Sequence, residues 1–349
     1  MTRRLLQAMA GAPHGGAEVF FLRLAVALQH AGEQQRVLIR RHPLRAKALN
    51  EAGISVAELG FRGPFDLATR LAFRREIVAW KPDLVLTWMS RATQLCPRGD
   101  FVHVARLGGY YDLRHYRRCD HLIGNTRAIV AYAVGRGWPA ARVHYLPNFV
   151  PDCRILSRLA RCDRRDPPAA RPLALALGRL HPNKGFDILL QALALVPEVN
   201  LWIAGEGPLR AELMRQTQRL GVGERVRFLG WREDVANLLA QADLVVCSSR
   251  HEPLGNVVIE AWAAEVPVIA LASDGPAALI EHGVSGLLVP LPGQRDGGAA
   301  GLAQAILRLA ESPDLRRKLA RGGREAYEAG FTEAAVVARY RRFFDEVTA

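Results

Sequence analysis

The sequence is poor in cysteine. Its 349 residues include five cysteines, which are Cys96, Cys119, Cys153, Cys162 and Cys247. Their dispersed positions match no metal-binding spacing, and an odd, scattered set in a chain of this size indicates reduced thiols. Because thiols stay reduced in the cytoplasm, the sequence predicts a cytoplasmic protein rather than a secreted, disulfide-bonded one.

Long hydrophobic runs are also missing. No window of about eighteen uninterrupted apolar residues is present, so no membrane-spanning helix is expected. The first ten residues, with Arg3 and Arg4 ahead of a few apolar residues, resemble a signal peptide superficially. The apolar part is too short for one and runs directly into the glycine-containing stretch 15–18. We therefore predict that this segment is the first strand of the fold.

Lysine is scarce, and positive charge is concentrated in the first half of the chain. Only four of the 47 Lys and Arg residues are lysines, and the formal net charge is +13. Residues 1–150 hold 22 Lys and Arg against 10 Asp and Glu, whereas residues 173–349 hold 19 against 21. This asymmetry favours contact between the first half and a polyanion or an anionic membrane surface, with an arginine-rich composition as the alternative explanation. No nucleic-acid-binding motif accompanies the charge, so nucleic acid is not an expected partner.

Strand-like and helix-like segments alternate along the whole chain. The length, with half of the residues hydrophobic, is sufficient for two domains with complete cores. The alternation predicts an α/β protein built on doubly wound parallel sheets. We predict a first domain over residues 1–150, a proline- and arginine-rich linker over 151–172, a second domain over 173–330, and an amphipathic C-terminal helix within 331–349.

The stretch 242–290 carries the clearest functional pattern. An apolar run is followed by a polar loop and by a segment whose apolar residues recur at helical spacing. In such a unit the loop at the carboxyl end of the strand is where ligands of open α/β sheets bind. Gly255 and Asn256 can begin the helix, whose first-turn N–H groups would bind an anion such as a diphosphate. Glu252 and Glu260 would then accept hydrogen bonds from sugar and ribose hydroxyls.

This stretch resembles the retaining glycosyltransferases of family 4, also called group 1 glycosyltransferases. The matching features are the Glu252-x7-Glu260 pair, the strand 266–269, the segment 274–281 and the block 282–290. The resemblance implies the GT-B fold, in which two Rossmann-like domains face each other across a cleft and the C-terminal helix crosses back to the first domain. It also implies a nucleotide-diphospho-sugar donor, with Leu254, Gly255, Asn256 and Glu260 among its contacts.

A second motif supports a diphosphate site. Residues 178–185 read Gly-Arg-Leu-His-Pro-Asn-Lys-Gly and follow an apolar, strand-like run. They resemble the family's Gly-Arg-Leu…Lys-Gly motif, in which the Arg and Lys bind the donor diphosphate, so Arg179 and Lys184 are predicted to do so. Two fixed cations would neutralise the charge that develops on the departing nucleoside diphosphate, in place of a metal ion.

Two more loops are donor-site candidates by the same resemblance. Gly15 and Gly16 form a glycine turn that in the family lies across the cleft from the donor diphosphate. Gly230, Trp231 and Arg232 follow another predicted strand, and Trp231 or Arg232 would stack on the nucleobase.

The acceptor site is predicted on the first domain. Many family members carry a histidine near the donor sugar in the loop that follows residue 101. The nearest histidine, His103, falls two or three residues early and is expected inside a strand, so we do not transfer that role to it. Arg106, Tyr110, Tyr111 and Asp112 are predicted to contact the acceptor instead.

The expected reaction is a front-face displacement with retention. Two close carboxylates, as in a retaining glycosidase, are not recognised, so Glu252 is predicted to orient the sugar rather than to attack it. No Asp-x-Asp motif is present, so we expect neither a metal ion nor another cofactor. Residues 250–262 look like those of lipopolysaccharide-core mannosyltransferases. That predicts GDP-mannose or a UDP-sugar as donor, and an anionic or lipid-linked glycan as acceptor on the cytoplasmic face of the inner membrane.

Three alternatives share parts of this pattern. A sugar-nucleotide epimerase of the same fold would use the donor without an acceptor. A capsule, exopolysaccharide or glycogen-type transferase would keep the donor site and change the acceptor. A non-enzymatic polyanion-binding protein would explain the charge alone. The sequence makes no prediction of the oligomeric state.

Overall fold

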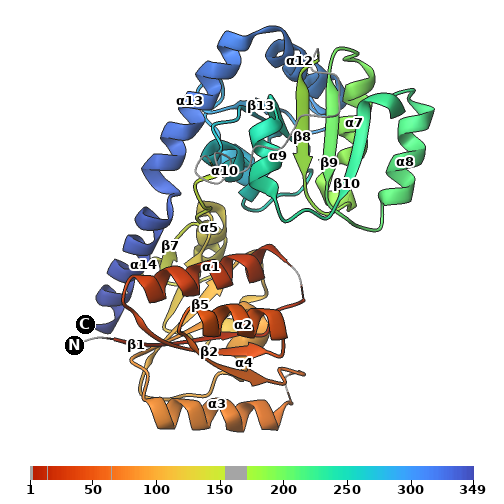
Figure 1. Cartoon of the computed structure of the whole chain (residues 1–349). Helices are drawn as coiled ribbons and strands as arrows, with labels where there is room; N and C mark the ends of the chain where they lie inside the picture. Colours follow the sequence, from red (N-terminus) through yellow and green to blue (C-terminus); the bar gives the residue numbers. More distant parts are fainter. Residues whose placement is uncertain (1–2, 14, 64, 154–170) are drawn as a thin grey trace. The chain divides into compact units, whose positions relative to one another are not determined.

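The computed structural model describes residues 3–13, 15–63, 65–153 and 171–349, which form two compact units (Figure 1). Unit 1 comprises Met1–Phe149 and Glu333–Ala349, and unit 2 comprises Val150–Thr332. Most of the predicted linker, residues 154–170, lies outside the described residues.

In the described part of unit 1, seven parallel strands form one sheet in the order β3-β2-β1-β4-β5-β6-β7. The strands are β1 Arg4–Met9, β2 Gln34–Arg40, β3 Ser55–Leu59, β4 Leu84–Trp88, β5 Val102–Leu107, β6 His121–Gly124 and β7 Val143–Tyr145. The helices are α1 Gly16–His30, α2 Pro43–Glu51, α3 Leu67–Trp80, α4 Met89–Leu95, η1 Leu113–Tyr116, α5 Arg127–Gly135, η2 Ala140–Arg142 and α14 Glu333–Thr348.

Unit 2 repeats this plan with six parallel strands among its described residues, in the order β10-β9-β8-β11-β12-β13. The strands are β8 Leu173–Leu177, β9 Asn200–Ala204, β10 Val226–Gly230, β11 Leu244–Cys247, β12 Val268–Leu271 and β13 Leu287–Val289. The helices are η3 Pro182–Lys184, α7 Phe186–Ala194, α8 Arg210–Arg219, η4 Gly223–Arg225, α9 Val235–Gln241, α10 Asn256–Ala263, α11 Asp274–Leu279, α12 Gly298–Glu311 and α13 Pro313–Gly330.

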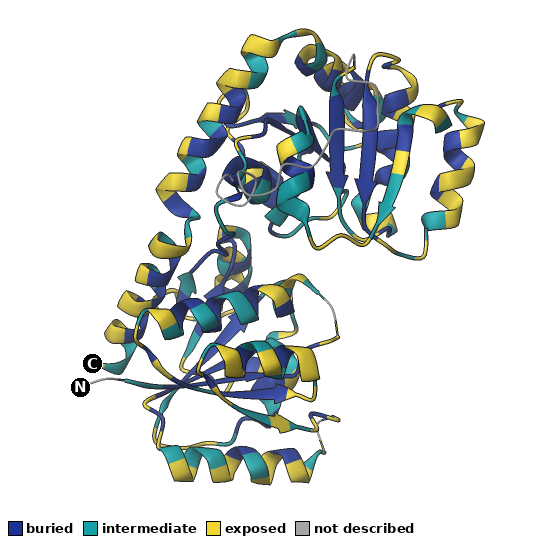
Figure 2. Cartoon of the chain, in the orientation of Figure 1, coloured by how far each residue is buried: buried dark blue, intermediate teal, exposed yellow. Residues whose placement is uncertain are grey.

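Both sheets are buried on their two faces, which explains why their central strands read as continuous apolar runs. Every residue of β4, β9, β11 and β12 is buried, and Figure 2 shows the central strands in the buried colour. Each unit has apolar clusters on both sides of its sheet. The predicted α/β class with two doubly wound parallel sheets is confirmed.

The C-terminal helix α14 belongs to unit 1. Its buried side chains join the same apolar cluster as those of α1; they are Val336, Val337, Tyr340, Phe343 and Phe344. Burial of five large apolar side chains, at about 1.5–3 kcal/mol each, is sufficient to hold the helix against the unit. None of the helices that the structure describes is long and apolar enough to cross a membrane.

His103 lies inside β5, as predicted, and titrates outside the ordinary range. Its side chain is buried with Nε2 3.0 Å from Thr87 Oγ1. Burial lowers the pKa of His103 to about 4, against the opposing charge of Asp120. The native protein therefore keeps this imidazole neutral at a pH where the unfolded chain protonates it.

This shift predicts a loss of stability in mild acid. Between the unfolded pKa of 6.5 and the folded pKa of about 4 the unfolded state binds more protons, so the free energy of unfolding falls as the pH drops through that window. Between pH 7 and pH 5 the share of His103 is about 2 kcal/mol. Urea unfolding of the wild type and of His103→Gln at both pH values measures it. The variant should lose about 2 kcal/mol less than the wild type, and equal losses would refute the assignment.

Candidate functional site

The predicted donor residues of unit 2 cluster at one edge of its sheet. Because all its strands are parallel, the loops that follow β8, β10 and β11 emerge at their carboxyl ends and share that edge. The loop after β8 carries Arg179 and Lys184, and the loop after β11 carries Glu252. The sheet order places β8 directly beside β11. Residues about 70 positions apart in sequence are thereby brought together.

Lys184 and Glu252 form an ion pair between these two loops. The side chains are 24% and 13% exposed, so the pair is largely shielded from water. Ser249 Oγ donates a hydrogen bond of 3.4 Å to the Glu252 carboxylate, and the Gly255 N–H donates another of 3.3 Å. Glu252 is thus held in a fixed orientation by three donors.

Glu260, on α10, contributes to the electrostatics around Lys184. Burial alone would lower the pKa of Lys184, but the carboxylates of Glu252 and Glu260 and the hydrogen bond to Glu252 outweigh it and raise that pKa. Lys184 is therefore a permanent cation at neutral pH. Lys184 comes from one predicted motif, and Glu252 and Glu260 come from the other. In the structure the charges of these three residues interact.

The turn before α10 is shaped by glycine. Gly255 precedes the helix in the left-handed region at φ 83°, where glycine is favoured, and Asn256 begins the helix. Leu254 is only 7% exposed and packs inward. The peptide carbonyl of Glu252 accepts a hydrogen bond of 2.7 Å from the Gly275 N–H at the start of α11. The N-terminus of α10, with its partial positive charge, therefore opens onto the Glu252 loop.

Arg179 presents a second cation at this edge. Its side chain is exposed on the loop that follows β8, and the described residues supply it with neither a hydrogen bond nor an ion pair. It is available to an anionic ligand, whereas Lys184 is already paired.

The third loop, after β10, adds an exposed aromatic ring. Gly230 has φ 71°, and its carbonyl accepts a hydrogen bond of 2.7 Å from the Gly205 N–H. Trp231 is 63% exposed, and Arg232 is paired with Asp234 at 2.6 Å. An exposed indole at the ligand-binding edge of the sheet is suited to stacking on a planar ring.

Arg250 is a positioning residue that the sequence did not reveal. Its guanidinium donates two hydrogen bonds, of 2.7 and 2.6 Å, to the carboxylate of Asp187 in the first turn of α7, and a third of 3.1 Å to the Pro182 carbonyl. These bonds tie the Glu252 loop to the Lys184 loop. In the sequence, Arg250 stands out only as an arginine two positions before Glu252. Its partner Asp187 lies 63 positions away, so the pattern does not reveal the pair.

In unit 1, Gly15 precedes α1 and Gly16 is its first residue. The buried carboxylate of Glu18 accepts a hydrogen bond of 2.7 Å from the Ala12 N–H, and a Cβ on Gly15 would lie 2.3 Å from a Glu18 oxygen. A side chain at position 15 would therefore have to displace the Glu18 carboxylate from this loop. Arg45, which donates a hydrogen bond of 3.0 Å to the Ala12 carbonyl, completes a charged cradle around this loop that the sequence did not predict.

The structure corrects the role predicted for Arg106. Its side chain is 2% exposed; Nε donates to Tyr340 Oη at 3.0 Å and the guanidinium bonds to Asn148. The guanidinium carbon lies 4.7 Å from the ring centroids of both Phe20 and Trp88. Since the guanidinium is buried inside unit 1 and bonded to Tyr340 of α14, Arg106 has a structural role in holding α14 and is not exposed to contact an acceptor.

The other predicted acceptor residues lie at the surface. Tyr110 is 45% exposed, and Tyr111 is half-buried and stacks on Tyr116. Asp112 caps the start of η1 and pairs with Arg114, whose hydrogen bonds lower the pKa of Asp112 to about 2.

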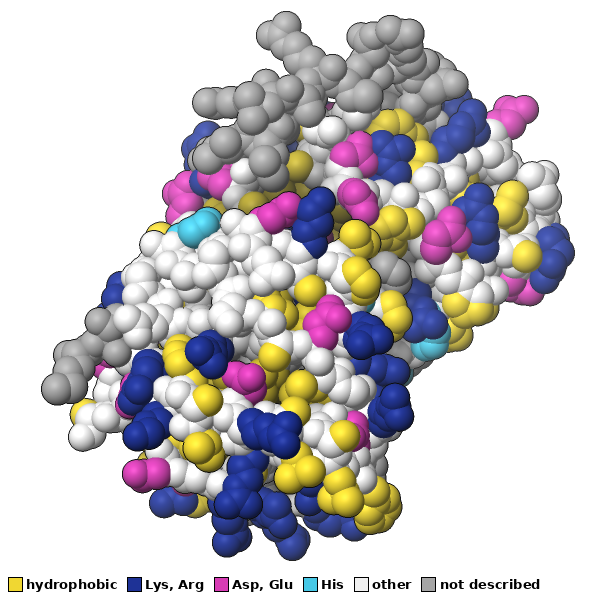
Figure 3. All heavy atoms as spheres, turned by 60° about the horizontal axis from the view of Figure 1, so that its bottom comes forward, with side chains coloured by type: hydrophobic (Ala, Val, Ile, Leu, Met, Phe, Trp, Pro, Cys, Tyr) yellow, Lys and Arg dark blue, Asp and Glu magenta, His cyan; other side chains and the backbone are white. Residues whose placement is uncertain are grey.

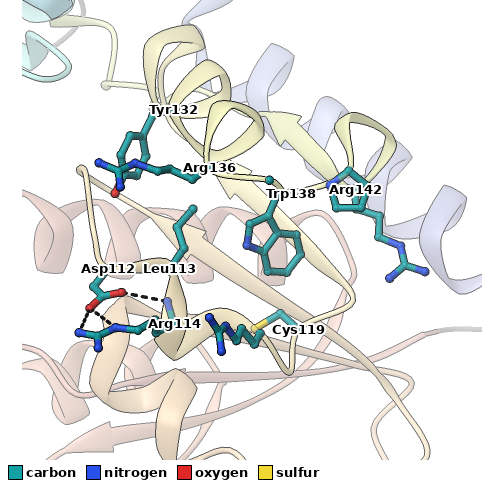
Figure 4. Close-up of a pocket in the computed structure, with 11 residues that line it drawn as sticks. Asp112, Leu113, Arg114, Cys119, Tyr132, Arg136, Trp138 and Arg142 are labelled. Atoms are coloured by element: carbon teal, nitrogen blue, oxygen red, sulfur yellow. Dashed lines mark hydrogen bonds and ion pairs between the residues drawn. The ribbon is translucent and has the colours of Figure 1, made fainter.

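Asp112 also lines a cavity of about 740 Å³ (Figure 4). The opposite wall comes from the end of α5 and the turn after it, where Tyr132, Arg136, Trp138 and Arg142 lie. Arg114 and Arg117 add two more cations, so four arginines and one carboxylate line the cavity. The volume and charge fit an anionic small molecule. Among the described residues, no group of three or more His, Cys, Asp and Glu side chains is placed to hold a metal ion.

Comparison with known proteins identifies the family. The model of glycosyltransferase family 4 matches residues 14–154, and the model of glycosyl transferases group 1 matches residues 171–312. The lipopolysaccharide core biosynthesis glycosyltransferases LpsE and LpsD of Rhizobium meliloti are 36% and 34% identical to this chain. The matches cover 93% and 95% of this chain, and 94% and 95% of the respective relatives.

A solved structure shares the fold. The Anabaena protein Alr3699/HepE, in complex with UDP and glucose, superimposes with a TM-score of 0.80 over 99% of this chain and all of its own, at 22% identity. The GT-B fold implied by the sequence motifs is confirmed. Two family models that together span most of the chain, and relatives above 30% identity along nearly all of it, show that this protein belongs to the family 4 (group 1) glycosyltransferases.

Proposed function

We propose that the protein transfers a hexose from a nucleotide-diphospho-sugar to a hydroxyl of an anionic or lipid-linked glycan, with retention and without a metal ion. The observation that carries this proposal is the cluster of Lys184, Glu252 and Glu260 beside the exposed Arg179. Two cations and a helix N-terminus suit a diphosphate, and two carboxylates suit the hydroxyls on either side of it.

The cations act on the leaving group. As the bond between the anomeric carbon and the diphosphate oxygen breaks, negative charge grows on that oxygen, and Arg179 and Lys184 stabilise it. The acceptor hydroxyl forms the new bond on the same face and passes its proton to the departing diphosphate. Glu252, fixed by Ser249 and Gly255, orients the sugar hydroxyls.

The nucleoside of the donor is proposed to bind α10 and the loop after β10. Glu260 accepts hydrogen bonds from the ribose, and Trp231, which is 63% exposed, stacks on the base. Gly15 and Gly16 remain proposed donor contacts from unit 1. The complex of the Anabaena protein with UDP and glucose supports a nucleotide-sugar donor, for which GDP-mannose or a UDP-sugar is proposed.

The acceptor proposed is a glycan of the lipopolysaccharide core. The names of both Rhizobium meliloti relatives support this pathway, and the arginine-lined cavity of unit 1 supports an acceptor that carries negative charge. Because such a glycan is attached to lipid, the proposal places the enzyme in peripheral contact with the cytoplasmic face of the inner membrane.

Thermal stabilisation by nucleotides tests the donor assignment. GDP, UDP and ADP, and their mannose, glucose and N-acetylglucosamine derivatives, are added without metal and with EDTA. One nucleotide series is expected to raise Tm, by the equivalent of about 2.7 kcal/mol at a concentration of 100 Kd. Glu260→Ala should reduce this shift, because the ribose hydroxyls lose their acceptor, while Glu325→Ala, an exposed glutamate on α13, should leave it unchanged.

Two outcomes would contradict the proposal. Stabilisation that requires a divalent metal would refute metal independence. Conversion of the donor to a free sugar or an isomer in the absence of any acceptor would indicate the epimerase alternative.

A further inference from the structure

Helix α3 of unit 1 carries large apolar side chains on its solvent-exposed face. Leu67, Leu71 and Val78 are 70%, 60% and 65% exposed, and Phe65, just before the helix, is 92% exposed. Single exposed apolar residues are common in proteins, but three on one helix with a fourth just before it are not. We call this surface, together with its arginines, the α3 face.

The three helix residues point in one direction. Positions 67, 71 and 78 fall within about 40° of one another at 100° per residue, so they form one stripe. The opposite side of the helix packs on the unit through Thr69 and Phe73, which are buried. The fold therefore uses one side of α3 and leaves an apolar stripe on the other.

Basic residues surround the stripe. Arg70, Arg74 and Arg75 are exposed within the helix, and Arg62 and Lys81 are exposed beyond its two ends. The acidic residue of the helix, Glu76, lies on the packed side and pairs with Arg36 at 3.1 Å. Figure 3 shows this end of unit 1, with Lys and Arg side chains intermixed with hydrophobic ones.

The positive charge around the apolar stripe indicates which kind of partner can bind there. Apolar side chains in the centre with arginines around them, on a helix of 14 residues at the surface, give the α3 face one apolar and one cationic contact surface. An anionic bilayer satisfies both parts: its acyl region accepts the apolar side chains and its headgroups pair with the arginines. We propose that the α3 face docks unit 1 on an anionic lipid surface.

Docking is separate from the donor site. The α3 face belongs to unit 1, and the nucleotide cluster of Lys184, Glu252 and Glu260 belongs to unit 2. The proposal extends the peripheral contact included in the proposed function by assigning it to one element. Failure of the vesicle assay would therefore leave the nucleotide assay unaffected, and the reverse also holds.

Sedimentation with lipid vesicles tests the proposal. The full-length protein is mixed with vesicles of phosphatidylcholine, with or without phosphatidylglycerol, and the bound fraction is measured. Binding is expected to the anionic vesicles and to weaken as salt is raised. The double variant Arg74→Ala/Arg75→Ala should lower the partition coefficient about 30-fold, and Leu67→Gln/Leu71→Gln at least about tenfold.

Matched variants separate the α3 face from general effects of charge and hydrophobicity. Leu195→Gln, an exposed leucine of unit 2, and Arg308→Ala/Arg321→Ala, two exposed arginines of unit 2, should bind vesicles like the wild type. All variants alter exposed side chains and should keep the wild-type Tm.

Three results would overturn the proposal. The first is absence of wild-type binding to anionic vesicles, and the second is equal binding by the α3 variants. The third is a dimer of the wild type that Leu67→Gln/Leu71→Gln converts to a monomer in analytical ultracentrifugation, because the α3 face would then be an interface between two copies.

Discussion

Replacing Lys184 with alanine is expected to lower kcat by about 10²–10³-fold while the protein stays folded. The reason is that Lys184 is fixed before the reaction: it is largely buried, paired with Glu252, and its pKa is raised by the Glu252 and Glu260 carboxylates after burial has opposed them. A cation that is already in position stabilises the charge on the departing diphosphate as it forms. A water molecule in the place of Lys184 would first have to reorient, which costs free energy.

Single-turnover kinetics with a saturating donor measure this effect on the chemical step. Lys184→Arg keeps the charge but changes the shape of the cation, and should recover only part of the rate. Lys318→Ala, an exposed lysine of α13, is the matched control and should behave as the wild type. If Lys184→Ala retained kcat within about twofold, the leaving-group role would be wrong.

The sequence predicted the fold, and it selected Lys184, Glu252 and Glu260, which the structure brings together, because both results depend on local patterns. Continuous apolar runs that alternate with helical stripes are sufficient to indicate two doubly wound sheets. The motifs at 178–185 and 252–260 each follow a strand, and two parallel strands that are neighbours bring their loops together. No single motif contains the Lys184–Glu252 ion pair, yet the topology makes it a consequence of both.

Interactions between residues far apart in the sequence were the part that could not be predicted. Arg106 lies near the end of a strand and precedes a glycine loop, as an acceptor contact would, but its partner Tyr340 lies 234 positions away on α14. Likewise, the exposure of Leu67 and Leu71 depends on which side of α3 packs against the unit. A one-dimensional pattern specifies neither of these contacts.

The turn at Gly185, where the Lys184 loop meets the Glu252 loop, is expected to tolerate no side chain without a loss of stability. Gly185 has φ 61°, and a Cβ built on it would lie 2.1 Å from the Ser248 carbonyl oxygen. The same turn is held by two hydrogen bonds: Ser248 Oγ donates to the Lys184 carbonyl at 2.9 Å, and the His251 N–H donates to the Asn183 carbonyl at 3.2 Å. Any side chain at position 185 pushes these loops apart.

Gly185→Ala should therefore cost about 3 kcal/mol of stability, from the left-handed backbone and the collision with a main-chain oxygen together. Thermal unfolding should show a Tm lower by about 6–12 °C. Nucleotide stabilisation should also disappear in the folded variant, since Lys184 and Glu252 sit on the two loops that separate.

Gly135→Ala is the matched control for the added methyl group. A Cβ at position 135 meets nothing within 4 Å, and alanine at the end of α5 should be neutral or slightly stabilising. If Gly185→Ala kept both the wild-type Tm and the nucleotide shift, the two loops would tolerate separation. The donor site could not then depend on their close contact, and the charge pair between Lys184 and Glu252 would have to form in more than one backbone geometry.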